Sequence, residues 1–438
     1  MNILAIKIQA SKWSGFGWAG AAGFVTLSAA HFGCTLNQAL ALIIASTVLL
    51  IWTHNRVSGL IAAVLFFMVK PLFVRIAYAI DKSVSGNGGF DLLGITPALL
   101  LAGLIIWQLF LRISAGEKIL IGRTRTLMWI FSAVAFLSIF NPANSILVGF
   151  AGFERNVLPN MLIFLTASFV LTEYADSKRF LKAFLVLGLL SCLYGIGQYF
   201  AGLYPWERDW VVDVAFGNST DGWLTVGLKG VEFRLFSLFY NNMDFTFSNS
   251  LIFALVISYS EAIDDKWKKI RLFYVVAWAT VLILSLERTP LVMSLAAIAV
   301  LFYLKSGPQR RKSILWKSST IAILFSVSLS LASPYLKETG ADKFIRLAEL
   351  TNPLVARSVE DRMQKNWEPT LKTIGSNPLG VGMGFGSQTK ANSIAAKTDF
   401  WIEPHNELLQ KTLETGLVGG IIFLLLLISV FRDGLKLS

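Results

Sequence analysis

The histidine best placed for chemistry stands at the start of the last long apolar run. His405 lies between Pro404 and Asn406, directly before the run 407–431. Proline, asparagine and the Glu407 that follows are typical of helix starts, so a helix is expected to open here. The helix dipole disfavours an imidazolium at this end, and a neutral imidazole can accept the proton of a hydroxyl. The alternative is an interfacial histidine that merely caps the helix.

Two arginines stand at comparable places along the chain. Arg288 follows Glu287 in the short turn between two apolar runs, and Arg234 precedes Asn241 and Asn242 at the start of another. A planar guanidinium matches the geometry of a phosphate group. Taken singly, Arg288 also reads as an interfacial charge paired with Glu287, Arg234 as a loop charge, and the asparagines as a helix cap.

A fourth segment, 359–387, joins an expected helix to a glycine-rich stretch. Arg362 and Trp367 lie on the helix, and Asn377-Pro378 is a turn signal. Alternate glycines then permit unusual backbone angles and the close approach of a ligand. They are Gly380, Gly382, Gly384 and Gly386. No strand precedes them, so a dinucleotide-binding fingerprint is not indicated.

Composition defines the surroundings of these residues. The chain has 438 residues, of which 55% are hydrophobic and 15% are charged. Soluble domains carry about 25% charged residues. The apolar runs are long and continuous, which predicts membrane-spanning helices and excludes a barrel of alternating strands. We expect an all-α polytopic fold with spans near 15–31, 36–52, 58–80, 93–111, 126–140, 158–174, 183–203, 243–260, 272–287, 290–304, 318–333 and 407–431.

The distribution of Lys and Arg predicts the orientation of about 12 transmembrane helices. Alternate gaps and both termini hold most of the basic residues, which places the two termini in the cytoplasm. The net charge of +12 is explained by this bias rather than by nucleic-acid binding. Two long external segments remain, 204–242 and 334–404. The second is cationic and is expected to be partly helical, which suits an anionic ligand or lipid headgroups.

This orientation places the four candidate cations on one face of the membrane. Arg234, Arg288, Arg362 and His405 all fall in external segments or at external helix ends. Several cations beside a neutral base fit an anionic, pyrophosphate-like leaving group and a hydroxyl nucleophile. No pair of external carboxylates suits a metal ion, since Asp81 and Asp91 stand apart in their shared gap.

The order of these motifs resembles the O-antigen ligase and polysaccharide polymerase superfamily. R-x-x-S and NN precede one span, RT stands at an outer turn, and DR…W…NPLGVGMGFG lies in the long external segment. HNELLQKTLETGLVGG then opens the last span, and YGIGQYFAG (194–202) is also similar to the family. The detailed resemblance covers about 230–431. It divides the chain into an N-terminal transmembrane region, 1–242, and a ligase-like catalytic region, 243–438.

The resemblance implies a GT-C-like, metal-independent and inverting glycosyltransferase of the cell inner membrane that needs no cofactor. Its donor would be a glycan on undecaprenyl pyrophosphate, used at the periplasmic face. His405 would activate the acceptor hydroxyl, and Arg288 and Arg234 would hold and neutralise the pyrophosphate. The residues assigned to substrate binding are Arg362, Asn242, Asn406, Gly382 and Gly384.

Several activities remain open at this stage. The acceptor could be the lipid A core in an O-antigen ligase, a growing glycan in a polymerase, or a protein. A metal-dependent oligosaccharyltransferase would require a different set of carboxylates. A lipid-linked glycan transporter would instead use polar groups near the membrane centre, for which Lys70 and Arg75 are the candidates.

Overall fold

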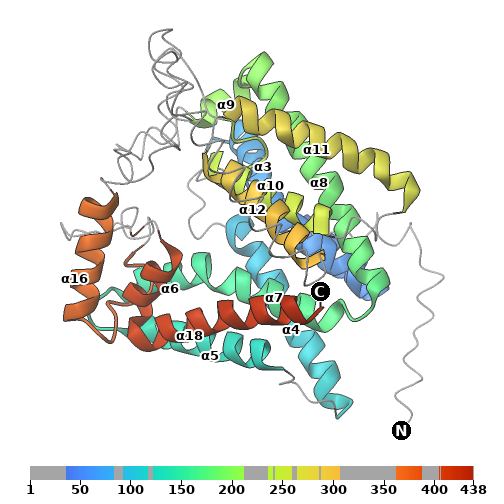
Figure 1. Ribbon diagram of the computed structural model, residues 1–438. Coiled ribbons are helices and arrows are strands. Elements are labelled where there is room, and N and C mark those ends of the chain that lie inside the picture. The colour runs from blue at the N-terminus through green and yellow to red at the C-terminus, as the bar shows by residue number, and fades with distance from the viewer. Residues whose placement is uncertain are drawn as a thin grey trace, which may run out of the picture. The chain divides into compact units, whose positions relative to one another are not determined.

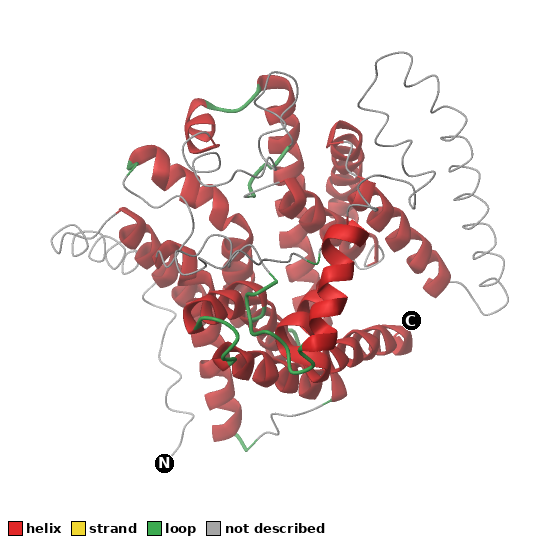
Figure 2. Cartoon of the chain, turned by 90° about the vertical axis from the view of Figure 1, so that its left-hand side faces the viewer, coloured by secondary structure: helices red, strands yellow, loops and turns green. Residues whose placement is uncertain are grey.

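The structure is a computed structural model that describes residues 36–82, 92–116, 122–211, 235–239, 242–258, 264–285, 288–305, 362–386, 404 and 406–437. These residues form helices joined by loops (Figures 1 and 2). The helices are α2 (Leu36–His54), α3 (Arg56–Ile80), α4 (Leu92–Ser114), α5 (Arg123–Leu137), η3 (Ser138–Phe140), α6 (Ile146–Asn156), α7 (Leu158–Val170), α8 (Tyr174–Ala201), α9 (Pro205–Trp210), α10 (Asn242–Ser258), α11 (Asp265–Ser285), α12 (Arg288–Lys305), η6 (Met363–Trp367), α16 (Glu368–Ser376) and α18 (Glu407–Leu437). Within these ranges no strand occurs, in agreement with the predicted all-α fold.

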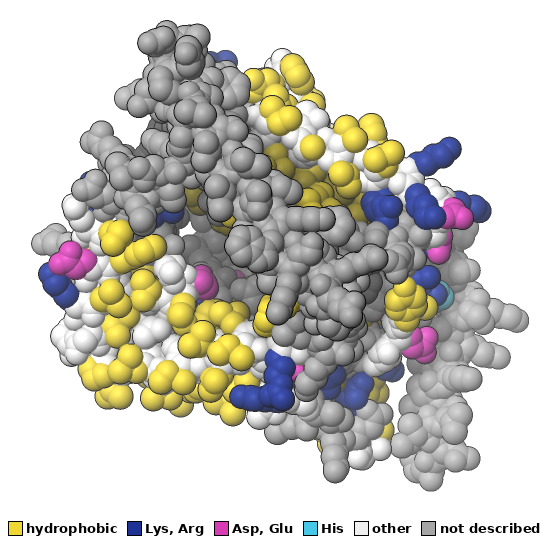
Figure 3. All heavy atoms as spheres, viewed as in Figure 1, with side chains coloured by type: hydrophobic (Ala, Val, Ile, Leu, Met, Phe, Trp, Pro, Cys, Tyr) yellow, Lys and Arg dark blue, Asp and Glu magenta, His cyan; other side chains and the backbone are white. Residues whose placement is uncertain are grey.

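The described helices have the lengths and surfaces of a membrane protein. Five are long and apolar enough to span a bilayer: Arg56–Ile80, Thr96–Ser114, Arg123–Phe140, Tyr174–Ala201 and Glu407–Asp433. Large hydrophobic side chains cover much of the visible surface (Figure 3), and Phe110, Ile283 and Phe431 are 66%, 69% and 61% exposed. Such broad apolar exposure is expected where the surrounding medium is lipid. The chain is therefore a multi-pass membrane protein.

The predicted spans agree with the helices in position more closely than in length. The spans 15–31 and 318–333 lie outside the described residues, and each of the others coincides with a helix. However, α8 and α11 begin well before the predicted starts at 183 and 272, because polar turns extend these helices beyond their apolar runs. A hydrogen bond from Lys182 of α8 holds the pKa of the Asp264 carboxyl, next to α11, below its usual range. The total of twelve spans stays a prediction.

The chain divides into two compact units. The first comprises residues 1–108 and 166–285, and the second comprises 109–165 and 286–438. In the first unit α8 packs against α3, α10 and α11. Asn249 of α10 is fully buried, accepts a hydrogen bond from Ser191 of α8 over 3.1 Å, and accepts another from Tyr274 of α11 at its carbonyl over 3.0 Å. The predicted boundary at 242 concerns function and stays a prediction.

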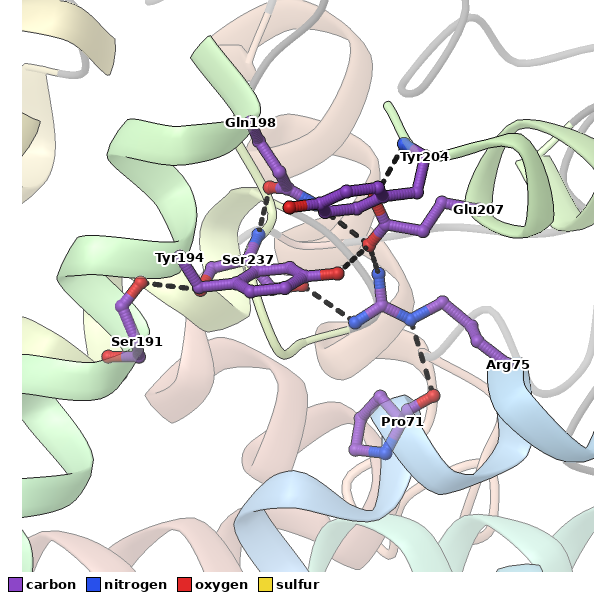
Figure 4. Close-up of polar contacts among 8 residues, drawn as sticks. All are labelled: Pro71, Arg75, Ser191, Tyr194, Gln198, Tyr204, Glu207 and Ser237. Carbon is purple, nitrogen blue, oxygen red and sulfur yellow. Dashed lines mark hydrogen bonds and ion pairs between the residues drawn. The ribbon is translucent and has the colours of Figure 1, made fainter. Parts of the chain in front are cut away.

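A buried ion pair fastens α9 to this unit. Arg75 of α3 and Glu207 of α9 are both fully buried, and Arg75 Nη1 lies 3.0 Å from Glu207 Oε1 (Figure 4). The same carboxylate oxygen accepts hydrogen bonds from Tyr194 and Gln198 of α8, over 2.8 and 2.9 Å. Phe236 covers the guanidinium at 4.8 Å from its ring centroid. The pair is thus enclosed by polar partners and aromatic rings, as a buried charge requires.

The second unit is built on α5 and α18, which pack side by side in opposite directions (Figure 1). Thr124, at the start of α5, donates to Asp433 near the end of α18 over 2.6 Å. Further along, the rings of Phe131 and Phe423 lie 5.2 Å apart. The opposite order of these contacts along the two helices establishes the antiparallel arrangement.

The short helix α6 completes the second unit. It was not predicted, because its apolar run is too short to cross a bilayer and lies in a presumed external gap. Its residue Phe153 joins Ile139 of η3, Val157 and Met383 in one hydrophobic core. Met383 belongs to the glycine-rich segment, so this segment is anchored in the core of the unit.

The ion pair generates a prediction about stability. Glu207→Ala leaves the Arg75 charge buried without its carboxylate, and we expect a loss of about 3–5 kcal/mol in the free energy of unfolding. Asp209→Ala, on the same helix, removes an exposed carboxylate 3.6 Å from Lys82 and should cost less than about 1 kcal/mol. Unfolding of the purified protein in mixed micelles measures both losses. Equal losses in the two variants would contradict the structural role of the ion pair.

Candidate active site

The start of α18 is defined by a side-chain cap. Asn406 Oδ1 accepts the backbone N–H of Leu409 over 3.1 Å, and the Asn406 carbonyl accepts that of Gln410 over 2.8 Å. Asn406 is therefore the N-cap residue of the helix that begins at Glu407. The predicted helix start is confirmed. His405 itself lies outside the described residues, between the buried Pro404 and the exposed Asn406.

The helix is broken at Gly416, which the sequence did not predict. Gly416 has φ 75° and ψ 178°, far from helical values. The hydrogen bond that Leu417 N–H would make to Leu413 in a regular helix is replaced by one to Pro378 O, over 2.9 Å. Two carbonyl groups before the break also bond outside the helix. The Leu413 carbonyl accepts the Val381 N–H over 2.9 Å, and the Glu414 carbonyl accepts the Gly382 N–H over 3.1 Å.

The segment that seals this break is the glycine loop, which we define as residues 377–386. Three backbone groups at the break, the Leu417 N–H and the carbonyls of Leu413 and Glu414, are paired with backbone groups of this loop. Unpaired backbone groups are costly in a membrane, and irregular backbone is tolerated there only when protein or water satisfies it. The break and the glycine loop are therefore one structural element, and neither is stable in this form without the other.

The glycine loop is also fixed from its other side. Asn141, after η3, donates its amide to Gly380 O over 2.9 Å, and Asn144 donates to Met383 O over 2.7 Å. Gly384 has φ 78°, and a Cβ on it would lie 2.5 Å from the Val148 carbonyl oxygen. The loop is thus held between two asparagine amides and α6 on one side and α18 on the other.

The prediction of unusual backbone angles in the loop is confirmed. Gly380, Gly382 and Gly384 all have positive φ. A Cβ on Gly382 would lie 3.0 Å from the Asn144 Cβ. Close packing within the protein therefore accounts for these glycines without a ligand, and substrate binding by Gly382 and Gly384 stays a prediction.

The glycine loop reaches the start of α18. A Cβ on Gly386 would lie 3.2 Å from Gln410 Cγ and 3.5 Å from Pro404 Cδ. Beneath it, Val381 and Phe385 share a hydrophobic cluster with Leu413 of α18 and Ile374 of α16. The loop therefore connects Gly382 and Gly384 to the residue that directly precedes His405 in the chain.

A stripe of charged side chains runs along the first turns of α18. Lys411 is buried, with its Nζ 3.0 Å from Glu407 Oε1 and 3.9 Å from Glu414 Oε2. Glu414 is fully buried, and its Oε1 accepts from Gln410 over 3.3 Å. The stripe leads from the exposed Glu407 to the break, and the two carboxylates compensate the buried ammonium.

The remaining predicted site residues are distributed over both units. Arg288 begins α12, but its side chain, like the whole of Arg234, lies outside the described residues. Arg362 is exposed, and the prediction of a helix in its segment is confirmed by η6 and α16. Asn242, at the start of α10 in the first unit, is 3% exposed. A common site for the two units stays a prediction.

Sequence reasoning missed the polar residues that fix this geometry. Lys411 and Glu414 stand four and seven positions after Glu407, a spacing that places all three on one helix face. Asn141 and Asn144 flank a proline and an alanine in a segment that reads as an ordinary turn. Their target carbonyls are more than 200 residues away in sequence, and no local pattern identifies such a pairing.

One of the two cations considered for transport, Arg75, has a structural role in the first unit. Arg75 is enclosed in the buried ion pair with Glu207, and Lys70 is half-buried on the same helix. Among the described residues, no group of three or more His, Cys, Asp and Glu side chains is gathered closely enough to bind a metal ion. Whether the reaction is metal-independent stays a prediction.

The described residues thus contain a long apolar helix that is broken at Gly416 and sealed by the glycine loop. Residues 273–424 match the family described as O-antigen ligase, and this range contains α12, the glycine loop, His405 and the break in α18. This match covers about a third of the chain and supports the resemblance to the O-antigen ligase and polymerase superfamily. Comparison with curated proteins and with solved structures found no significant match.

The break generates a prediction about Gly416. Gly416→Ala places a Cβ 2.6 Å from the Leu379 carbonyl carbon at a φ of 75°, so we expect the glycine loop to be displaced and the protein destabilised by about 1–3 kcal/mol. Gly375→Ala in α16 meets open space and should be neutral or stabilising. Limited proteolysis of the loop and thermal unfolding check both variants. Equal resistance to protease in the two variants would contradict the sealing of the break by the loop.

Proposed function

We propose that the chain is a glycosyltransferase that moves a glycan from undecaprenyl pyrophosphate to an acceptor hydroxyl, and that it is an O-antigen ligase acting on the lipid A core. The observation that carries the proposal is the family match over 273–424. This range includes both His405 and the break in the helix that follows it. The proposed fold is GT-C-like with about 12 spans, both termini in the cytoplasm and the site at the periplasmic face of the inner membrane.

In the proposed mechanism, His405 is the general base. Its neutral imidazole takes the proton of the acceptor hydroxyl as the oxygen attacks the anomeric carbon from the face opposite the carrier. The bond from that carbon to the phosphate oxygen breaks, and its electron pair leaves with the undecaprenyl pyrophosphate. The configuration of the anomeric carbon is therefore inverted. The position beside a capped helix N-terminus supports this role, because the helix dipole disfavours a charged imidazole there.

The proposed electrostatic stabilisation comes from arginine. Charge grows on the leaving phosphate, and Arg288 and Arg234 would hold and neutralise it without a metal ion. Arg362 would bind glycan or phosphate from the external segment, and its exposure at the start of the helical segment that precedes the glycine loop supports contact with a large ligand. Asn242, Asn406, Gly382 and Gly384 are proposed to line the substrate path.

A polymerase is the nearest alternative within the same family. It needs the same base and the same leaving-group arginines, and it differs in the acceptor, which would be a growing glycan. Transfer to a protein is a third possibility of the same kind. A transporter is less well supported, because Arg75 is already occupied by Glu207 within its own unit.

The role of His405 generates a direct prediction. His405→Ala should lower the transfer rate by about 10²–10⁴-fold, the usual contribution of a general base, while expression and folding are retained. His54→Ala changes an exposed histidine at the end of α2 and should have no effect on the rate. Transfer from purified lipid-linked glycan to lipid A core in micelles measures both variants. Full activity of the His405 variant would refute the mechanism.

A further inference from the structure

Aromatic side chains gather at one end of the first unit, on and beside the short helix α9. The rings of Tyr204 and Trp206 are nearly parallel, with an interplanar angle of 9° and centroids 6.3 Å apart. The ring of Tyr194, on α8, lies 6.1 Å from that of Tyr204. Tyr204 is 47% exposed, and Trp206 is half-buried. We define Tyr204 and Trp206 as the aromatic pair, which presents flat ring surface at the edge of the unit.

The aromatic pair is attached to the buried ion pair of the first unit. Glu207 Oε2 accepts the Tyr204 backbone N–H over 3.3 Å (Figure 4), and the Tyr204 carbonyl accepts the N–H of Glu207 over 3.0 Å. The guanidinium of Arg75 lies 5.9 Å from the Trp206 ring centroid, a cation–π contact. Arg75 also donates from Nη2 to the Ser237 carbonyl over 2.6 Å. The backbone of the pair is therefore fixed before a ligand arrives, which lowers the ordering cost of binding.

Charged side chains follow the aromatic pair on α9. Arg208 and Asp209 are exposed, and Asp209 Oδ2 lies 3.6 Å from Lys82 Nζ, with both of these side chains more than half exposed. Exposed charges are costly in hydrocarbon, so this end of the unit is expected to meet water and not acyl chains. A sugar ring suits such a surface, because its C–H face packs on an aromatic ring while its hydroxyls bond to charged and polar groups.

The length of α8 separates the aromatic pair from the lysines at the other end of this helix. α8 is apolar enough to span a bilayer, and its 28 residues extend about 42 Å at about 1.5 Å per residue, beyond the ~30 Å hydrocarbon core. Its first turns carry Lys178 and Lys182, which pair with Asp264, and its last turn leads into α9. Since lysine favours the cytoplasmic face, the aromatic pair is assigned to the periplasmic face, where the proposed reaction takes place.

We propose that Tyr204 and Trp206 form a binding site for a sugar ring of the glycan substrate. The inference rests on the proposed function and adds to it an aromatic contact for the glycan. The apolar face of the sugar packs on the exposed ring of Tyr204, and its hydroxyls remain toward water and the charged residues of the same short helix. The donor glycan and the acceptor both present this chemistry, and the kinetic test separates them.

The test compares variants that keep or remove the aromatic face. Tyr204→Phe keeps the ring and loses the hydroxyl, whereas Tyr204→Leu keeps apolar bulk and loses the ring. Aromatic residues also gather at membrane interfaces without binding a ligand. Phe200, in the last turn of α8, is 75% exposed, so Phe200→Leu is the matched control for such a role. Transfer in micelles is measured against donor concentration at saturating acceptor, and against acceptor concentration at saturating donor.

We expect Tyr204→Leu to raise the KM for one of the two substrates by about 3- to 10-fold and to leave kcat within about 2-fold, because stacking contributes equally before and during the reaction. The substrate whose KM rises is the one that the aromatic pair binds. Tyr204→Phe and Phe200→Leu should each keep KM within about 2-fold of the parent. An unchanged KM in Tyr204→Leu, or an equal rise in Phe200→Leu, would indicate a merely interfacial role and overturn the inference.

A direct binding measurement separates this inference from the proposed reaction. The free oligosaccharide of the substrate whose KM rises is titrated into the protein in micelles, and Tyr204→Leu should bind it at least about 3-fold more weakly than the parent. His405→Ala should bind it as the parent does. Full transfer activity of His405→Ala would refute the proposed mechanism and leave the sugar site standing. Equal affinity of Tyr204→Leu and the parent would overturn the sugar site and leave the reaction standing. Trp206→Leu replaces Tyr204→Leu in both measurements if the latter does not fold.

Discussion

The structure depends on one constraint, which is that no backbone polar group inside a membrane can be left without a partner. The last helix meets this constraint in an unusual way, because it is interrupted at Gly416 and the freed groups of Leu413, Glu414 and Leu417 pair with the glycine loop. In a regular helix these backbone groups would bond to one another within the helix, and none would be left to bond to the loop. The interruption therefore creates a specific attachment point for the glycine loop.

From this attachment the rest of the candidate site follows. The glycine loop reaches Pro404 and the capped start of α18, and the residue between them is His405. The buried Lys411, paired with Glu407 and Glu414, occupies the same helix face between the start and the break. The start of α18 is thus capped by Asn406 and packed against the glycine loop, and this supports the proposed role of the residue before it.

The same requirement for paired backbone groups is met in the first unit. Its irregular turn at Ser237 is buried, and each of its polar groups is matched by a side chain or carbonyl of α3 or α8. The charge that helps to hold it, Arg75, is in turn matched by Glu207.

Much of this could be predicted from sequence because it is local. Apolar runs identify the long helices such as α3, α8 and α18 but not the short α6 and α9, and the Pro404-Asn406-Glu407 signal identifies the start of α18. What could not be predicted depends on partners distant in sequence. The break at Gly416 requires Pro378 and Val381, and the role of Arg75 requires Glu207, which is 132 residues away in sequence. Unusual backbone angles were predicted for four alternate glycines, and three of them have positive φ, but the protein atoms that fill the space around them were not predicted.

We propose that the chain consumes a glycan carried on a lipid pyrophosphate. The most direct test of this reaction is the length of the glycan left on that carrier when the gene is deleted. The account predicts full-length chains on undecaprenyl pyrophosphate above a bare lipid A core. Single repeat units on the carrier would keep the reaction chemistry but identify a polymerase. Unchanged glycans on the carrier and on lipid A would contradict the account.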